Sequence, residues 1–133
     1  IYFQYPYAWG ESYSFTNEDG SLTNTVSDIT GEQALYVDVY LETDALTALQ
    51  TALELVDGEI SEIVETTFGG LPAFAATYTQ TTDTGTYTSV MISMENEQAA
   101  SVAVFTFSGA GEPDSAVIDL VGATLQFFPP LLN

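Results

Sequence analysis

The feature that most constrains this chain is the absence of every side chain that can carry a positive charge. Its 133 residues include 19 Asp and Glu but no Lys, Arg or His, and the formal net charge is −19 at pH 7. Salt bridges between side chains are therefore excluded, and the carboxylates repel one another at neutral pH. Apolar residues nevertheless make up 46% of the sequence, which predicts a packed core rather than a disordered chain.

The same composition predicts an unusual response to acid. As carboxylates take up protons, the net charge falls toward neutral, because only the α-amino group can become cationic. Crowded carboxylates are expected to have raised pKa values in the folded state, so the native state binds more protons than the unfolded one. Stability then grows as the pH falls through those pKa values, and we expect the melting temperature to rise between pH 7 and about pH 4. Trypsin, which cleaves after Lys or Arg, has no target in this sequence.

Missing residue types also exclude several functions. A Ser or Thr nucleophile would have no His or Lys as its base, and there is no Cys to act as a nucleophile. Without Lys or Arg to displace counterions, nucleic acid and anionic membranes are not expected partners. The partners that the composition leaves open are an unknown protein or a cationic partner.

Apolar periodicity predicts the elements of the first half of the chain. Short strands are expected at 13–15 and 22–26, and a longer one at 34–41. Thr43 or Asp44 is the predicted N-terminal cap of a helix. This helix is expected to end at Gly58, with the glycine backbone in the left-handed conformation. The apolar stripe of this helix is expected to comprise Leu46, Leu49, Leu53 and Val56.

The second half predicts a run of antiparallel strands and a second helix. The expected strands are 59–67, 71–80, 86–94 and 99–107, with Val102, Val104 and Phe105 toward the core. Asp114 is expected to cap a helix that contains Val117, Leu120 and Val121 and ends at Gly122, before a last strand at 124–128. This order predicts an α+β fold, a mainly antiparallel β-sheet flanked by two helices, in a single domain over 1–128 with a tail at 129–133.

Three segments resemble the PsbP-like superfamily, which includes the photosystem II extrinsic subunit and many bacterial lipoproteins. They are the opening Phe3-x-Tyr5-Pro6-x-x-Trp9, the strand and helix over 34–56, and Gly70-Leu71-Pro72-Ala73 with the later Phe105-x-Phe107. The resemblance covers nearly the whole chain and implies an antiparallel sheet flanked by helices, often in a non-catalytic binding or accessory role. The superfamily has no shared catalytic residues to carry over, and this chain departs from it in lacking every basic residue.

Two acidic turns are candidate calcium ligands, because hard cations prefer several oxygen ligands. One contains Asn17, Glu18 and Asp19, and the other contains Glu95 and Glu97 on either side of an Asn. Neither matches the spacing of a dedicated calcium loop, so solvated turns are the simpler interpretation. We expect no cofactor other than weakly bound calcium.

Two apolar segments are candidate contact surfaces. Tyr5, Tyr7 and Trp9 are suited to stacking on a sugar or a partner, although such aromatic residues are more often part of the core. The tail at 127–132 is apolar for a chain end, so it is expected either to dock on the domain or to form a contact between copies. The chain is thus predicted to be a monomer or a weak homo-oligomer.

Together these features predict a non-catalytic, secreted or cell-surface binding or accessory domain that tolerates acid and trypsin. One alternative is a carboxylate-based hydrolase active in acid, because Asp83-Thr84-Gly85 matches the triplet of aspartic proteases. That triplet follows a polar segment and lies where a hairpin turn is needed, so a turn is the favoured interpretation. The other alternative is a variant engineered to remove all basic residues.

Overall fold

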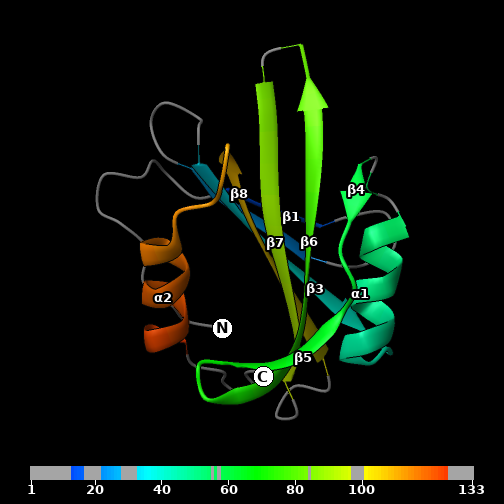
Figure 1. The fold of residues 1–133 in the computed structure, drawn as a ribbon. Helices are drawn as coiled ribbons and strands as arrows, with labels where there is room; N and C mark the ends of the chain where they lie inside the picture. The colour runs from blue at the N-terminus through cyan, green and yellow to red at the C-terminus, as the bar shows by residue number, and fades with distance from the viewer. Residues whose placement is uncertain are drawn as a thin grey trace.

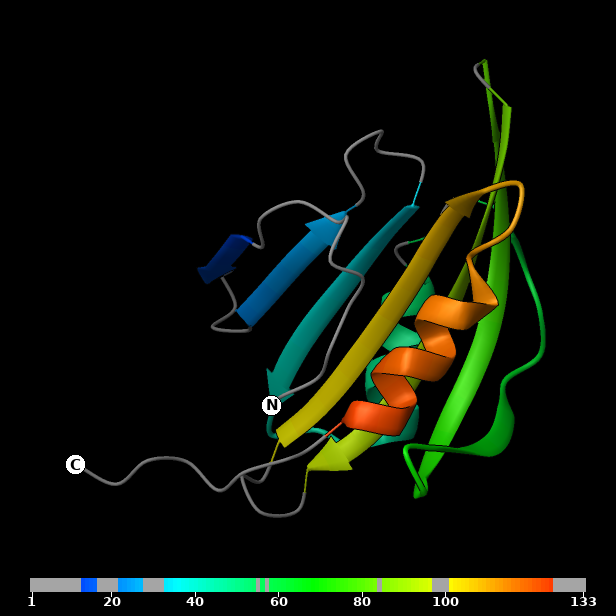
Figure 2. The same ribbon diagram turned by 90° about the vertical axis from the view of Figure 1, so that its left-hand side faces the viewer.

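A computed structural model describes residues 13–16, 22–27, 33–54, 56, 58–83, 85–96 and 101–125. They form one antiparallel sheet with a helix on each face, which confirms the predicted α+β class (Figures 1 and 2). The strands are β1 (Tyr13–Thr16), β2 (Leu22–Ser27), β3 (Gln33–Leu41), β4 (Glu59–Ile60), β5 (Val64–Phe68), β6 (Leu71–Thr82), β7 (Gly85–Asn96) and β8 (Ser101–Ala110). The helices are α1 (Ala45–Glu54) and α2 (Ser115–Thr124), and neither is long enough to cross a bilayer.

The strand order is β1-β2-β3-β8-β7-β6-β4, and β5 also pairs with β6. Strands β6, β7 and β8 form the expected meander, whereas β3 pairs with the distant β8 rather than with the strand that follows α1. The β6–β7 hairpin continues to Thr82 and Gly85, so its turn is shorter than the segment 81–85 that separates the predicted strands 71–80 and 86–94. Strand β7 likewise continues through Asn96, where the sequence predicted a turn.

Strand β8 lies at the centre of the sheet and is buried on both faces. Because side chains alternate along a strand, Val102 and Val104 face α1 while Phe105 faces α2. All three residues are buried as predicted, but they belong to two clusters on opposite faces of the sheet. The α1-side cluster comprises Ala45, Ala48, Leu49, Ala52, Leu53, Ala76, Met91, Val102 and Val104. The α2-side cluster comprises Leu35, Val37, Phe68, Ala73, Ile92, Met94, Ala103, Phe105, Phe107, Val117 and Val121.

Helix α1 begins at the predicted Asp44 but differs in its end and its stripe. The Asp44 carboxylate accepts hydrogen bonds from the Thr47 backbone N–H (2.8 Å) and the Thr47 hydroxyl (3.0 Å), which lower the pKa of Asp44. The buried stripe is mostly alanine, while Leu46 is exposed and Val56 lies beyond the helix. Gly58 is not left-handed; glycine is required there because a Cβ would collide with the Thr79 carbonyl oxygen.

Helix α2 begins at its predicted cap and extends further than expected. The Asp114 carboxylate accepts a hydrogen bond from the Ala116 N–H at 2.9 Å, and Val117 and Val121 are buried. Gly122 does not end the helix, which runs to Thr124 with Leu125 as its cap, so the predicted strand is wrong at 124 and 125, and residues 126–128 lie outside the described residues. Gly122 instead makes room for Phe68, since a Cβ there would lie 3.0 Å from the phenylalanine ring.

Candidate functional site

Most of the site residues predicted from the sequence lie outside the described residues. These are the aromatic Tyr5, Tyr7 and Trp9 and the acidic-turn residues Asn17, Glu18, Asp19 and Glu97. Glu95 is exposed near the end of β7, opposite Val102. Within the described ranges no group of three or more acidic side chains could hold a metal ion, and calcium binding stays a prediction. Asp83 of the protease-like triplet is exposed at the tip of the β6–β7 hairpin.

A different candidate site lies at the edge of the sheet that β4 and β5 form. Residues 59–68, here called the edge strap, run along β6 from beside α1 toward α2 (Figure 1). Ile63 packs against the α1-side cluster and Phe68 belongs to the α2-side cluster. In the part of the chain that the structure describes, the strap pairs with β6 on one side and with no strand on the other.

The strap contains a β-bulge that interrupts its pairing with β6. Ile60 pairs with Tyr78 and Val64 pairs with Ala75, so residues 61–63 lie opposite only residues 76 and 77. The one extra residue bends the strap away from its neighbour, as bulges do. Bulges are common beside functional sites, where they change the direction in which side chains point.

Ser61 holds the bulge in place through its backbone and its side chain. Its N–H donates to the Thr77 carbonyl oxygen at 2.8 Å, as a normal ladder bond would. The Thr77 N–H, however, donates to the Ser61 hydroxyl oxygen at 2.9 Å. The same hydroxyl group donates its own hydrogen to the Glu62 carbonyl oxygen at 3.1 Å. The serine side chain thus satisfies a backbone donor that the displaced strap leaves behind.

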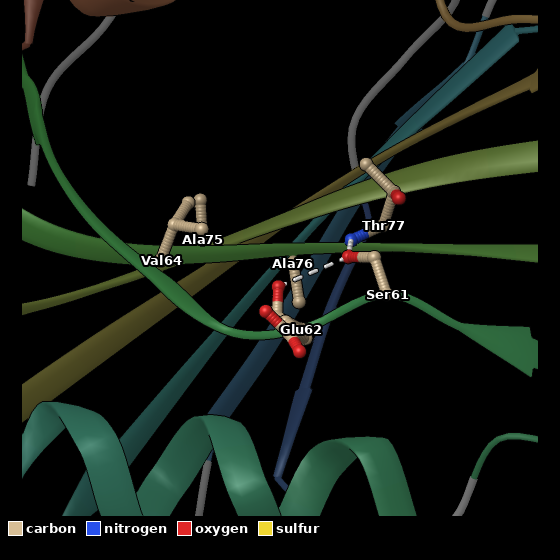
Figure 3. Close-up of a pocket in the computed structure, with 6 residues that line it drawn as sticks. All are labelled: Ser61, Glu62, Val64, Ala75, Ala76 and Thr77. Atoms are coloured by element: carbon tan, nitrogen blue, oxygen red, sulfur yellow. Dashed lines mark hydrogen bonds between the residues drawn. The ribbon is translucent and has the colours of Figure 1, made fainter.

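A pocket of about 370 Å³ opens where the bulge separates the strap from β6. It is lined by Ser61, Glu62, Val64, Ala75, Ala76 and Thr77 (Figure 3). Val64 and Ala75 point to one side of the strand pair, and the Glu62 side chain points to the other, toward α1 (Figure 3). The pocket therefore has an apolar wall and one charged residue, Glu62, among the six that line it.

The outer surface of the strap combines apolar and acidic side chains. Six large apolar side chains are exposed among the described residues, and Ile60 (44%), Val64 (54%) and the adjoining Leu71 (41%) lie on or beside the strap. Glu59, Glu62 and Glu65 are exposed along the same ten residues. No side chain of this protein can neutralise them, because the sequence has no Lys, Arg or His.

The two kinds of side chain are separated by face within the bulge and β5, but not in β4. Ile60 is opposite Tyr78, which packs against the α1-side cluster, so Ile60 lies on the α1 face and its neighbour Glu59 lies on the other. Glu65 is opposite Phe74, which packs against the α1-side cluster, so Glu65 lies on the same face as α1. Glu62 also points toward α1 (Figure 3). Val64 is opposite Ala75, which packs against the α2-side cluster, so the exposed Val64 belongs to the other face.

The sequence pattern predicts one uninterrupted strand over 59–67, and that prediction gives no indication of a site in this segment. A signal was present in the spacing of Glu59, Glu62 and Glu65, which recur at every third position. An unbroken strand would place successive members of such a series on alternate faces. A bulge between them is one way to bring Glu62 and Glu65 to the same face.

Comparison with known proteins supports the fold class alone. No protein-family model matches the sequence, and no curated protein matches it. The structure resembles a crystal structure of a protein from Bacteroides thetaiotaomicron VPI-5482, with a TM-score of 0.62 and 14% sequence identity. The match covers 93% of this chain but only 43% of that protein, so this chain spans less than half the length of its structural neighbour.

Proposed function

We propose that this chain is a non-catalytic binding or accessory domain and that the edge strap is its contact surface. The observation that carries the proposal is an edge with no strand paired on its outer side in the described structure, beside exposed Ile60, Val64 and Leu71. An edge strand offers a row of backbone donors and acceptors to another chain. Exposed apolar side chains gathered at one place are typical of interaction sites.

The setting of this function is proposed from sequence features. The resemblance to PsbP-like domains supports an extracellular or cell-surface location. The lack of Lys and Arg supports persistence where trypsin-like proteases are abundant, and the expected gain in stability between pH 7 and about pH 4 supports tolerance of acid.

The proposal is tested by selecting peptides from a random displayed library on the immobilised domain. Enriched peptides should bind the wild type, lose binding to an Ile60→Ser/Val64→Ser double variant, and still bind Leu41→Ser. Leu41 is a matched control because it is 62% exposed at the end of β3, away from the strap. Thermal melting of each variant confirms that it is folded.

Two outcomes would contradict the proposal. One is that enriched peptides bind the strap variant as well as they bind the wild type, which would place the contact elsewhere. The other is that no peptide is enriched, and hydrolysis of substrates in a screen between pH 3 and pH 6 would then favour the hydrolase alternative. An Asp83→Asn variant that abolished such activity would support the aspartic-protease alternative.

A further inference from the structure

We infer that the edge strap binds an extended, basic segment of a partner protein by strand addition, with basic and apolar side chains alternating along that segment. This inference rests on the proposed function and deepens it by naming the chemistry of the partner. It follows from three properties of the strap: an outer side that no described strand pairs with, exposed carboxylates in a chain without cationic side chains, and the position of Glu62 and Glu65 on the opposite face from Val64.

The unpaired outer side determines the conformation of the partner. In an antiparallel ladder every second residue directs its backbone N–H and C=O away from its neighbour. β5 pairs with β6 on one side, and no strand of the described residues pairs with its other side, so the outward backbone groups of Val64–Phe68 can accept one more strand there. An extended segment of about five or six residues, the usual strand length, matches this edge.

The carboxylates determine the charge of the partner. Glu59, Glu62 and Glu65 are exposed within a chain that has no cationic side chain to pair with any of them. A partner with Lys or Arg supplies the missing charges and is also attracted from a distance by the net charge of −19.

The same carboxylates argue against a second copy of this chain as the partner. Two straps placed edge to edge would bring their glutamates together, and two molecules of net charge −19 repel each other at neutral pH. Charged side chains on an edge strand are a common means of blocking self-pairing. The strap therefore favours pairing with a basic strand of another protein over pairing with the strap of a second copy of this chain.

The separation of Glu62 and Glu65 from Val64 determines the order of residues in the partner. Glu62 and Glu65 lie on the face toward α1, while Val64 and the apolar wall of the pocket at Ala75 lie on the opposite face. Side chains of an added strand alternate between these faces. Basic residues at every second position would thus meet the glutamates, and apolar residues between them would meet Val64 and the pocket.

The test uses two synthetic peptides of about seven residues with the same composition, a length that covers one strand. One peptide alternates Lys and Val, and the other places all Lys before all Val. Binding to the wild-type domain is measured by calorimetry at low salt. The alternating peptide should bind at least about tenfold more tightly, because only it satisfies both faces of the strap when it pairs as a strand.

Single variants locate the contact. Glu62→Gln and Glu65→Gln should each weaken binding of the alternating peptide about two- to fivefold, the range of one exposed ion pair. Glu112→Gln is the matched control, because it removes the same charge from an exposed residue in the loop before α2. Methylating alternate backbone nitrogens of the peptide, in the register that faces the strap, should abolish binding.

The inference is overturned if both peptides bind equally and Glu112→Gln weakens binding as much as the strap variants, because binding then follows from overall charge. It is also overturned if peptides selected from the random library compete at the strap but carry no Lys or Arg. That second result would leave the proposed function intact. Failure of the library selection itself would instead remove the proposed function.

Discussion

On the α1 side of the sheet the helix supplies small side chains, whereas on the α2 side the sheet supplies large aromatic ones. Ala45, Ala48 and Ala52 let α1 lie close to the aliphatic residues of β7 and β8. On the other side, Phe68 packs against Phe105 and Phe107, with ring centroids 5.5 and 6.1 Å apart. The aromatic rings fill the space that the α2 side chains leave.

The two helices are consequently positioned by different contacts. Helix α1 is fixed by the buried Ser93 hydroxyl of β7, which donates to the Ala45 carbonyl oxygen at 2.7 Å. Helix α2 is fixed at its start by Gln33 of β3, whose side-chain oxygen accepts from the Asp114 N–H at 3.0 Å. Its last turn depends on shape, because Gly122 faces the Phe68 ring. The difference implies that the α2 side is more sensitive to changes in side-chain volume.

The largest effect is expected from truncating the aromatic core. Phe105→Ala should lower the free energy of unfolding by about 3–5 kcal/mol, because it removes a fully buried ring and leaves a cavity. Val104→Ala, at the next residue but facing α1, should cost about 1.5–3 kcal/mol. Urea unfolding of both variants measures the difference. A larger loss for Val104→Ala would reverse the comparison.

Enlarging a side chain on α2 should have the next largest effect. Gly122→Val should destabilise the domain by about 1–3 kcal/mol, since the new Cβ would begin 3.0 Å from the Phe68 ring. Ala123→Val, on the exposed neighbour in the same helix, should change stability by no more than about 0.7 kcal/mol. Equal losses in chemical denaturation would contradict the assigned contact with Phe68, because valine has a higher helix propensity than glycine.

Removing the hydrogen bond that anchors α1 should have a smaller effect. Ser93→Ala should cost about 0.5–1.5 kcal/mol, the net contribution of one hydrogen bond to stability. The same substitution at Ser115, which is exposed at the start of α2, should change stability by less than about 0.5 kcal/mol. Urea unfolding checks both, and a neutral Ser93→Ala would show that packing alone positions α1.

The smallest effect concerns the pH dependence of the α1 cap. The hydrogen bonds from Thr47 to Asp44 lower the pKa of Asp44 in the folded state. The stabilisation of the fold by the ionised Asp44 is therefore present above the unfolded-state pKa, and it is lost as the pH falls through the folded-state pKa. This local change opposes the overall rise in melting temperature expected toward about pH 4. The stability difference between wild type and Asp44→Asn should therefore shrink between pH 6 and about pH 3.

Melting temperatures across that range, with Asp119→Asn as the control, separate the cap from the simple loss of a charge. Asp119 is exposed on α2, so the control removes one carboxylate without removing a hydrogen bond to Thr47. A difference between wild type and Asp44→Asn that stays constant across the range would contradict the assigned role of the cap.

Much of the fold could be predicted because its strands and helices have strong local sequence patterns. Alternation predicted β3 and the β6–β8 meander, and both Asp44 and Asp114 cap their helices as their sequence positions indicated. The errors concern residues whose role depends on distant neighbours. Gly58 and Gly122 resemble helix ends in the sequence, but one makes room for the Thr79 carbonyl and the other for Phe68.

The candidate site was harder to predict for the same reason. The sequence identifies acidic and apolar residues in the strap, but the bulge that brings Glu62 and Glu65 to one face depends on pairing with β6. Ser61 supports that bulge through Thr77, sixteen residues away, and no local motif indicates this bond. The sequence-based candidates were instead drawn from turns and aromatic runs, where chemical type is visible without a partner strand.

The central position of β8 has a consequence for the order in which the chain folds. Strands β6, β7 and β8 are joined by short connections. The residues of β3, in contrast, pair with residues of β8 that lie 60 positions (Leu41 to Ser101) to 76 positions (Gln33 to Gly109) further along the chain. Such distant pairing is slow, because the loop must close before its contacts form. Until β3 arrives, one edge of the most apolar strand is open to other unfolded chains, the situation in which folding intermediates aggregate. The net charge of −19 then keeps nascent copies apart while that pairing forms.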